Sequence, residues 1–200
     1  MNNFLAIDTS SRYLTVLAVK GEKKVLKYLD DCAMQHSVKL MGVIDAALKE
    51  AELSPAECDF FAAVTGPGSF TGIRIGISAA KGFAAGADKP LLAITSFDLL
   101  AYNVKDENFY TVIDAAHGHY YACGYGNGGE VVSPPAYVSA EEVGAFGKPV
   151  YGFEALPFEN YTRLDAGACL YAAARLNAHK ISDTLNALYV RKSQAEEGRR

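Results

Sequence analysis

The sequence predicts an α/β fold of two related lobes, each with strands and helices in the order βββαβα and the second lobe trimmed. Two observations carry this prediction. Apolar, β-branched runs alternate with stretches of helical periodicity along the chain. The pattern then restarts in the middle, where AIDTSSRYLTVLAV (6–19) aligns without a gap with VIDAAHGHYYACGY (112–125), and each stretch carries an Ile-Asp pair.

The first half accounts for one full lobe. It opens with an apolar run that ends in Asp8 and hydroxyl residues, which is typical of a buried strand leading into a polar loop. Alternating or β-branched residues predict further strands, and apolar residues at helical spacing predict helices, the last of them capped by Ser96. The predicted strands are 3–10, 13–19, 24–29, 59–64 and 91–94, and the predicted helices are 37–52, a helix running to about 86, and 96–102.

The second half repeats the order with shorter pieces. Its predicted strands are the two in 112–125, then 131–138 and 149–153, and its predicted helices are a short one from Ser139 and an Ala-rich one at 166–179. We therefore expect a first lobe at 1–104 and a smaller second lobe at 105–200, joined tightly because no low-complexity linker separates them.

Composition and charge argue against several classes of function. Of 200 residues, 50% are hydrophobic and 21% are charged, as in ordinary globular proteins. A net charge of −4 argues against autonomous nucleic-acid binding, which favours a basic face. The start of the chain does not resemble a signal peptide, and no apolar run approaches the ~20 residues of a membrane span. The four cysteines form no zinc-binding pattern, so we expect a cytoplasmic chain with free thiols and no metal site.

One aspartate ends the first strand of each half, Asp8 in the first and Asp114 in the second. Duplicated βββαβα halves with this feature match the RNase H-like, actin-like ATPase and sugar-kinase (ASKHA) architecture, in which such turns face a cleft and handle nucleotide phosphates. Weak nucleotide binding by Asp8, Thr9, Ser10 and Asp114 is one interpretation. In the other, each carboxylate accepts backbone N–H bonds within its own turn.

The stretch TGPGSFTGIRIG (65–76) looks like a phosphate-binding loop but lacks the required spacing. A Walker motif is not reproduced, because the spacing from Gly66 to Gly72 is one residue too long and Ile73 stands where Lys is needed. Gly66, Pro67 and Gly68 are instead expected to turn the chain, with Thr71 or Ser69 as the helix N-cap.

The helix that follows carries a stripe of small residues at every fourth position: Gly72, Gly76, Ala80 and Ala84. Each helical glycine costs about 1 kcal/mol relative to alanine, so close packing must compensate. Because the helix is apolar around its circumference, it has two faces to bury. The stripe packs either inside its own lobe or against another chain.

At GPGSFTGIRIGISAAKG (66–82) the chain resembles the bacterial TsaB (YeaZ) family of the tRNA threonylcarbamoyladenosine machinery. Weaker motifs follow in the family order across the chain: LAIDTS (5–10), QHS (35–37), ITSFDLLAY (94–102), VIDAAHGHYYA (112–122) and LYVRKSQAEE (188–197). The second half is shorter than in many relatives.

The resemblance implies a non-catalytic, pseudoenzyme subunit that binds and activates its paralogue TsaD. That complex threonylcarbamoylates N6 of the adenosine beside the anticodon in tRNAs reading codons that begin with A. The ATPase TsaE is the second implied partner, tRNA is met only through the complex, and a homodimer is the alternative association. No cofactor of its own is implied, although ATP or ADP could lie at the partner interface.

Departures from the TsaD pattern support that role. TsaD carries a metal-binding His-x-x-x-His where this chain has Ser96 and Leu100, and Leu cannot ligate a metal. Relatives also show an Arg and a Glu where Ala116 and His119 stand, so no function is transferred to these positions.

By the same resemblance, the helix 37–52 and the helix that carries the small-residue stripe are the pair that docks onto TsaD or onto a second copy. The predicted interface residues are Ser37, Leu40, Met41, Ile44, Gly72, Ile73, Gly76, Ile77, Ala80 and Ala84. No catalytic residue is predicted. The alternative function is an autonomous ASKHA-type nucleotide-binding phosphotransferase that uses Asp8 and Asp114, although both turns lack the glycines such kinases place around phosphates.

Overall fold

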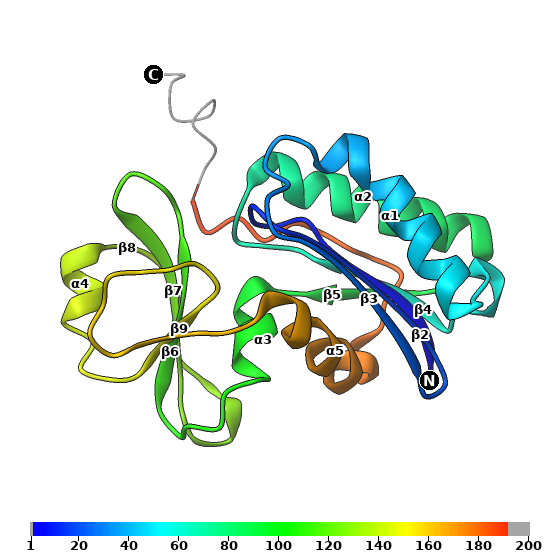
Figure 1. Ribbon diagram of the computed structural model, residues 1–200. Helices are drawn as coiled ribbons and strands as arrows, with labels where there is room; N and C mark the ends of the chain where they lie inside the picture. Colours follow the sequence, from blue (N-terminus) through cyan, green and yellow to red (C-terminus); the bar gives the residue numbers. More distant parts are fainter. Residues whose placement is uncertain (1, 192–200) are drawn as a thin grey trace.

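The computed structural model describes residues 2–191, which fold into two mixed sheets with helices around the first (Figure 1). The first five-stranded sheet has the order β3-β2-β1-β4-β5. Strands β3, β2 and β1 are antiparallel neighbours, whereas β4 and β5 run parallel to β1. The strands are β1 (Asn3–Asp8), β2 (Leu14–Lys20), β3 (Lys23–Leu29), β4 (Phe60–Val64) and β5 (Leu91–Ile94).

Helices cover both faces of this sheet, which explains why β1 is apolar at consecutive positions. Leu5 and Ile7 point to the face covered by α1 (His36–Ala51) and α2 (Phe70–Ala87). Phe4 and Ala6 point to the other face, covered by α3 (Ser96–Ala101) and α5 (Ala166–Asn177). Figure 1 shows α1 and α2 side by side on one layer. A 3₁₀ turn, η1 (Pro55–Glu57), precedes β4.

The second sheet repeats the first. Its order, β8-β7-β6-β9-β10, matches β3-β2-β1-β4-β5 strand for strand, and β6 pairs antiparallel with β7 and parallel with β9. The predicted duplication is confirmed. Its elements are β6 (Phe109–Asp114), β7 (His119–Tyr125), η2 (Asn127–Gly129), β8 (Val131–Ser139), α4 (Ala140–Gly144), β9 (Val150–Gly152) and β10 (Tyr161–Arg163), and η3 (Ala178–Lys180) follows α5 against the first sheet.

The second lobe is trimmed at its helices. Where α1 has 16 residues, α4 has 5. Between β9 and β10, where the first lobe has α2, the described residues 153–160 contain no helix. The three-residue strand β10 was not predicted, because Tyr-Thr-Arg is too short for an alternating pattern.

Side-chain caps mark the starts of α2, α3, α4 and α5, the last of them through Asp165. Ser69, one of the two predicted caps, accepts a hydrogen bond from the Gly72 amide and begins α2. Ser139, the predicted start of the short helix, accepts a hydrogen bond from the Glu142 amide and caps α4. The predicted cap of α3 is wrong by one residue. Thr95 accepts the Asp98 amide at 2.9 Å, and Ser96 is instead buried.

The chain after residue 165 returns to the first lobe. Helix α5 packs on α3 and on the first sheet, Ser182 forms an antiparallel bridge with Leu91, and the Leu188 amide donates to the Thr65 carbonyl at 2.8 Å. The division at residue 104 stays a prediction, with this return as a feature it did not anticipate. Residues 192–197 of the last motif lie outside the described part. No helix within residues 2–191 is long and apolar enough to cross a membrane.

Candidate functional site

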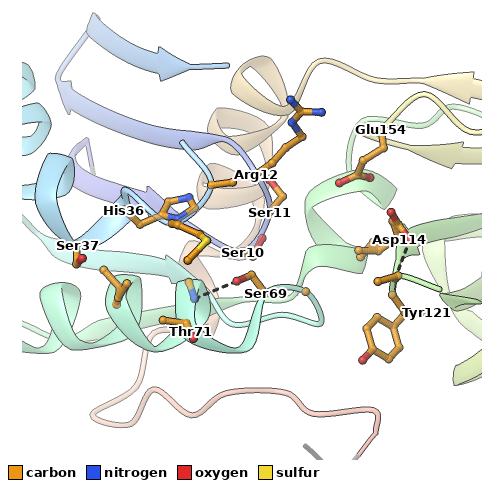
Figure 2. A pocket seen from close by; sticks show the side chains of 18 residues that line it. Ser10, Ser11, Arg12, His36, Ser37, Ser69, Thr71, Asp114, Tyr121 and Glu154 are labelled. Carbon is orange, nitrogen blue, oxygen red and sulfur yellow. Dashed lines mark hydrogen bonds between the residues drawn. The ribbon is translucent and has the colours of Figure 1, made fainter. Parts of the chain in front are cut away.

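A cleft of about 610 Å³ lies between the two lobes (Figure 2). Its first-lobe wall comes from the turn after β1, the start of α1 and the loop before α2. Its second-lobe wall comes from the turn after β6 and from Glu154, which follows β9. The lining includes Ser10, Ser11, Arg12, His36, Ser37, Ser69, Thr71, Asp114, Tyr121 and Glu154.

The two matched aspartates close their own turns. Asp8 Oδ1 accepts the Ser10 amide at 2.8 Å and the Ser10 hydroxyl at 2.7 Å. Asp114 Oδ1 accepts the Ala116 amide at 2.8 Å, two residues along as in the first lobe. Both carboxylates therefore accept backbone N–H bonds within their own turns, which is the second of the two interpretations given for them.

Their surroundings nevertheless differ. Asp8 is 4% exposed and lies behind the cleft, and burial raises the pKa of its carboxyl, although the Ser10 hydrogen bonds oppose that shift. Asp114 is exposed and lines the cleft. Of the four predicted nucleotide-binding residues, the cleft presents Ser10 and Asp114, whereas Asp8 and Thr9 are buried beneath it.

The loop before α2 is filled by the chain's own oxygens. The Ser69 amide donates to the Ser10 carbonyl at 2.6 Å. A Cβ on Gly68 would lie 2.1 Å from the Ser10 oxygen, and one on Gly72 would lie 2.0 Å from the Thr9 oxygen. An anion at this loop would meet these carbonyl oxygens, so the geometry agrees with a turn rather than with a phosphate cradle.

Glu154 is a cleft residue that sequence reasoning missed. Figure 2 shows its carboxyl and that of Asp114 facing one another across the second-lobe wall. Glu154 Oε2 is buried and has no hydrogen-bond partner among the described residues. Burial raises the pKa of Glu154, and the charges of Asp114 and Asp8 raise it further. Its position just beyond the carboxyl end of β9, the counterpart of β4, is the signal that could have identified it.

His36, the first residue of α1, also lines the cleft and is buried, with Nε2 2.9 Å from the Tyr13 carbonyl oxygen. His119 stacks on Tyr137, with ring centroids 4.8 Å apart. Within residues 2–191 no three His, Cys, Asp or Glu side chains come together as a metal site. Ser96 and Leu100 are both buried in the core around α3.

The small-residue stripe does not face a partner, so that prediction is wrong. Gly72, Gly76, Ala80 and Ala84 are buried inside the first lobe. A Cβ on Gly76 would lie 2.5 Å from Thr9 Oγ1. The missing side chains allow α2 to lie directly on the end of β1 and its loop.

Four larger members of the predicted interface are also buried inside the first lobe. They fill the core between the helices and the first sheet, and they are Leu40, Ile44, Ile73 and Ile77. Ser37 and Met41 are the exposed members of the predicted set.

The opposite faces of α1 and α2 form a second hollow. A groove of about 640 Å³ runs between them, lined by Ser37, Leu40, Met41, Phe70, Thr71, Arg74, Ile75, Ser78 and Ala79. Large apolar side chains stand exposed along α1 and before it: Met34 at 98%, Val38 at 82% and Met41 at 55%. Of the predicted interface residues, Ser37, Leu40 and Met41 line this groove, whereas none of the small-residue stripe does.

Comparison with known proteins places these features in a family. A family model described as TsaD, tRNA N6-adenosine threonylcarbamoyltransferase, matches residues 30–156, more than half of the chain. The tRNA threonylcarbamoyladenosine biosynthesis protein TsaB of Bacillus subtilis is 32% identical over 119 residues, which cover 58% of this chain and 52% of the relative. The TsaB protein of Escherichia coli K12 is 31% identical over 125 residues, covering 60% and 54%.

The solved structures agree at the level of fold. YeaZ from Pseudomonas aeruginosa superposes with a TM-score of 0.75 and 22% identity, covering 90% of this chain and 93% of that one. A crystal structure described as an uncharacterized protein with similarity to peptidase YEAZ, also from Pseudomonas aeruginosa, gives 0.79 and 22%, covering 96% and 100%. In the two TsaB matches, the chain spans about half the length of the curated relative.

Proposed function

This chain belongs to the TsaD family and, within it, to the bacterial TsaB (YeaZ) group. From that premise we propose that it is a non-catalytic subunit of the machinery that makes threonylcarbamoyladenosine in tRNA. It binds TsaD and holds it in the active arrangement. TsaD then threonylcarbamoylates N6 of the adenosine beside the anticodon in tRNAs reading codons that begin with A.

The exposed apolar groove between α1 and α2 carries this proposal. Exposed apolar patches of this kind mark interaction sites on soluble proteins. Val38 and Met41 project from the same helix whose inner face packs on the sheet, so their exposure in the single chain leaves apolar surface for a partner to cover. A second copy of this chain is the competing occupant.

The cleft chemistry supports a role without catalysis. Phosphate transfer needs donors and a cation aimed at the phosphates. Here the loop before α2 meets the Thr9 and Ser10 carbonyls, and the second-lobe wall presents the carboxyls of Asp114 and Glu154. These groups disfavour a polyanion unless it arrives with a cation.

The remaining partners follow from the same proposal. TsaE associates with the complex, and ATP or ADP binds at a partner interface rather than in this chain alone. The chain meets tRNA only within the complex, since its net charge is −4. The assembly works in the cytoplasm.

Co-purification with TsaD from the same genome tests the proposal. Wild type should bind TsaD and be required for tRNA modification in a reconstituted assay. Met41→Asp should abolish co-purification, since it buries a charge in an apolar contact. Val131→Asp is the matched control, because Val131 is also 55% exposed but lies on the second lobe. Equal binding by both variants would contradict the groove as the contact.

The alternative function, an autonomous phosphotransferase, retains one favourable observation: Asp114 projects into the 610 Å³ cleft. ATP hydrolysis by the purified chain, measured with Asp114→Asn as control, separates the two functions. We expect no turnover. Hydrolysis lost in Asp114→Asn would overturn the non-catalytic assignment.

A further inference from the structure

One cationic side chain in the wall of the α1–α2 groove is held in a fixed position. The guanidinium carbon of Arg74 lies 3.8 Å from the Phe70 ring centroid. Arg74 Nε donates a hydrogen bond to the Tyr189 hydroxyl at 3.0 Å. The Phe70 and Tyr189 rings lie 4.9 Å apart, so the guanidinium plane is positioned by two aromatic side chains.

The outer edge of this guanidinium is unused. Within residues 2–191 the Nη atoms of Arg74 have no hydrogen-bond or ion-pair partner, although the side chain is exposed. Two lysines on β2 and β3 differ in this respect. Lys20 pairs with Glu57 at 2.8 Å, and Lys23 pairs with Glu52 at 2.6 Å.

Charge complementarity indicates what the groove accepts. Among the nine described residues that line the groove, Arg74 carries the only charge, and the others are apolar or hydroxyl residues. A guanidinium with two free N–H groups in one plane matches a carboxylate bidentately. A carboxylate is therefore the group that a docked apolar surface would need to leave no uncompensated charge.

We propose that Arg74 determines the specificity of this docking surface by binding a carboxylate of the partner, with Tyr189 as its positioning residue. The partner presents an apolar helix face to the groove and an Asp or Glu side chain to Arg74. The inference rests on the proposed function, which assigns TsaD to this groove. Preorganisation of Arg74 by Phe70 and Tyr189 lowers the ordering cost of binding, and arginines held in this way are frequent interface hot spots.

The C-terminal segment thereby helps to position a side chain of the groove, because Tyr189 accepts a hydrogen bond from Arg74. Tyr189 stands four residues after Leu185, which is buried in the core under α2, and one residue after Leu188, whose amide is hydrogen-bonded to the Thr65 carbonyl. The hydroxyl that fixes Arg74 therefore comes from a segment anchored to the body of the first lobe rather than from α2 itself.

Binding of TsaD by Arg74→Ala, Arg74→Lys and Tyr189→Phe tests the proposal, with Lys81→Ala as the matched control. Lys81 is exposed on the same helix, outside the groove lining, and its removal changes the net charge equally. We expect a Kd at least about tenfold weaker for both Arg74 variants, because a lysine cannot form the planar fork. Lys81→Ala should bind like wild type, and Tyr189→Phe should bind about threefold more weakly.

Positioning has its own readout in the free chain. The Arg74 Nε–H resonance should exchange slowly with solvent in wild type and quickly in Tyr189→Phe, at unchanged melting temperature. Unchanged exchange would overturn the role of Tyr189. Equal affinity of wild type and Arg74→Ala for TsaD would overturn the carboxylate partner. A wild type that does not bind TsaD at all would instead overturn the proposed function, and the carboxylate partner with it.

Discussion

Gly76 shows how one missing side chain sets the position of a helix. It lies on α2 over Thr9, whose hydroxyl donates to the Gly72 carbonyl at 2.7 Å. The same helix carries Gly82, around which a Cβ would meet nothing within 4 Å. Two glycines of one helix thus have opposite requirements.

Gly76→Ala should destabilise the chain by about 1–3 kcal/mol, because the new methyl displaces Thr9 and disrupts its hydrogen bond. Gly82→Ala should stabilise it by up to about 1 kcal/mol through helix propensity. Thermal melts of both variants measure the difference. A stabilised Gly76→Ala would contradict the close contact with Thr9.

Glu154 should make stability depend on pH. Folding raises the pKa of Glu154 above the unfolded value of 4.5. Its contribution to the free energy of unfolding is therefore fully present below pH 4.5, where the carboxyl is protonated, and declines as pH rises through the folded pKa. Glu154→Gln should therefore melt higher than wild type at pH 7, and this advantage should disappear near pH 4. The exposed Glu159→Gln is the control. An equal advantage at both pH values would refute the assignment.

At the scale of elements, the duplicated lobes differ in what covers their sheets. Helices cover both faces of the first sheet. On the second sheet, α3 packs against β6 and β7 on one face, and the other face has only the short α4 and irregular chain. The segment after α5 completes the first lobe. Leu185, at 1% exposure, fills the core beneath α1 and α2.

Leu185→Ala should consequently cost about 2–5 kcal/mol, the usual range for a buried leucine. Leu176→Ala, at a position 53% exposed on α5, should be close to neutral. Urea denaturation of both variants gives the comparison. A neutral Leu185→Ala would mean that the C-terminal segment contributes little to the first lobe.

At the scale of the whole molecule, side-chain contacts join the two lobes. The Tyr13 hydroxyl donates to the Phe153 carbonyl at 3.3 Å, and Arg163 donates to the Tyr13 hydroxyl at 3.3 Å. Arg191 donates to the Tyr137 hydroxyl at 2.7 Å. These contacts agree with the tight joining expected from the lack of a linker.

The isolated chain should bind tRNA weakly. With a net charge of −4 it has little surface to neutralise phosphates, so we expect a Kd no tighter than the roughly 10⁻⁴–10⁻⁶ M of non-specific binding. Fluorescence anisotropy at physiological salt measures it, with the TsaD complex as control. Tight binding that persists at high salt would contradict a role that reaches tRNA only through the complex.

The sequence by itself determined the local elements and their repetition. The strand ends at Asp8 and Asp114, the helix start at Ser139 and the alternation of apolar runs depend on neighbouring residues, so the sequence alone predicted them. It also narrowed the cap of α2 to Ser69 or Thr71. The same holds for the rejection of a Walker loop, which depends on spacing alone.

Only the tertiary structure decided which faces are buried. The spacing of Gly72 and Gly76 predicted a close contact but not its other side, because Thr9 lies 63 positions from Gly72 and meets it only when β1 packs under α2. Glu154 and Tyr189 reach their sites in the same way. Contacts between distant segments depend on how the sheet orders its strands, and no local pattern encodes which face of an all-round apolar helix will meet them.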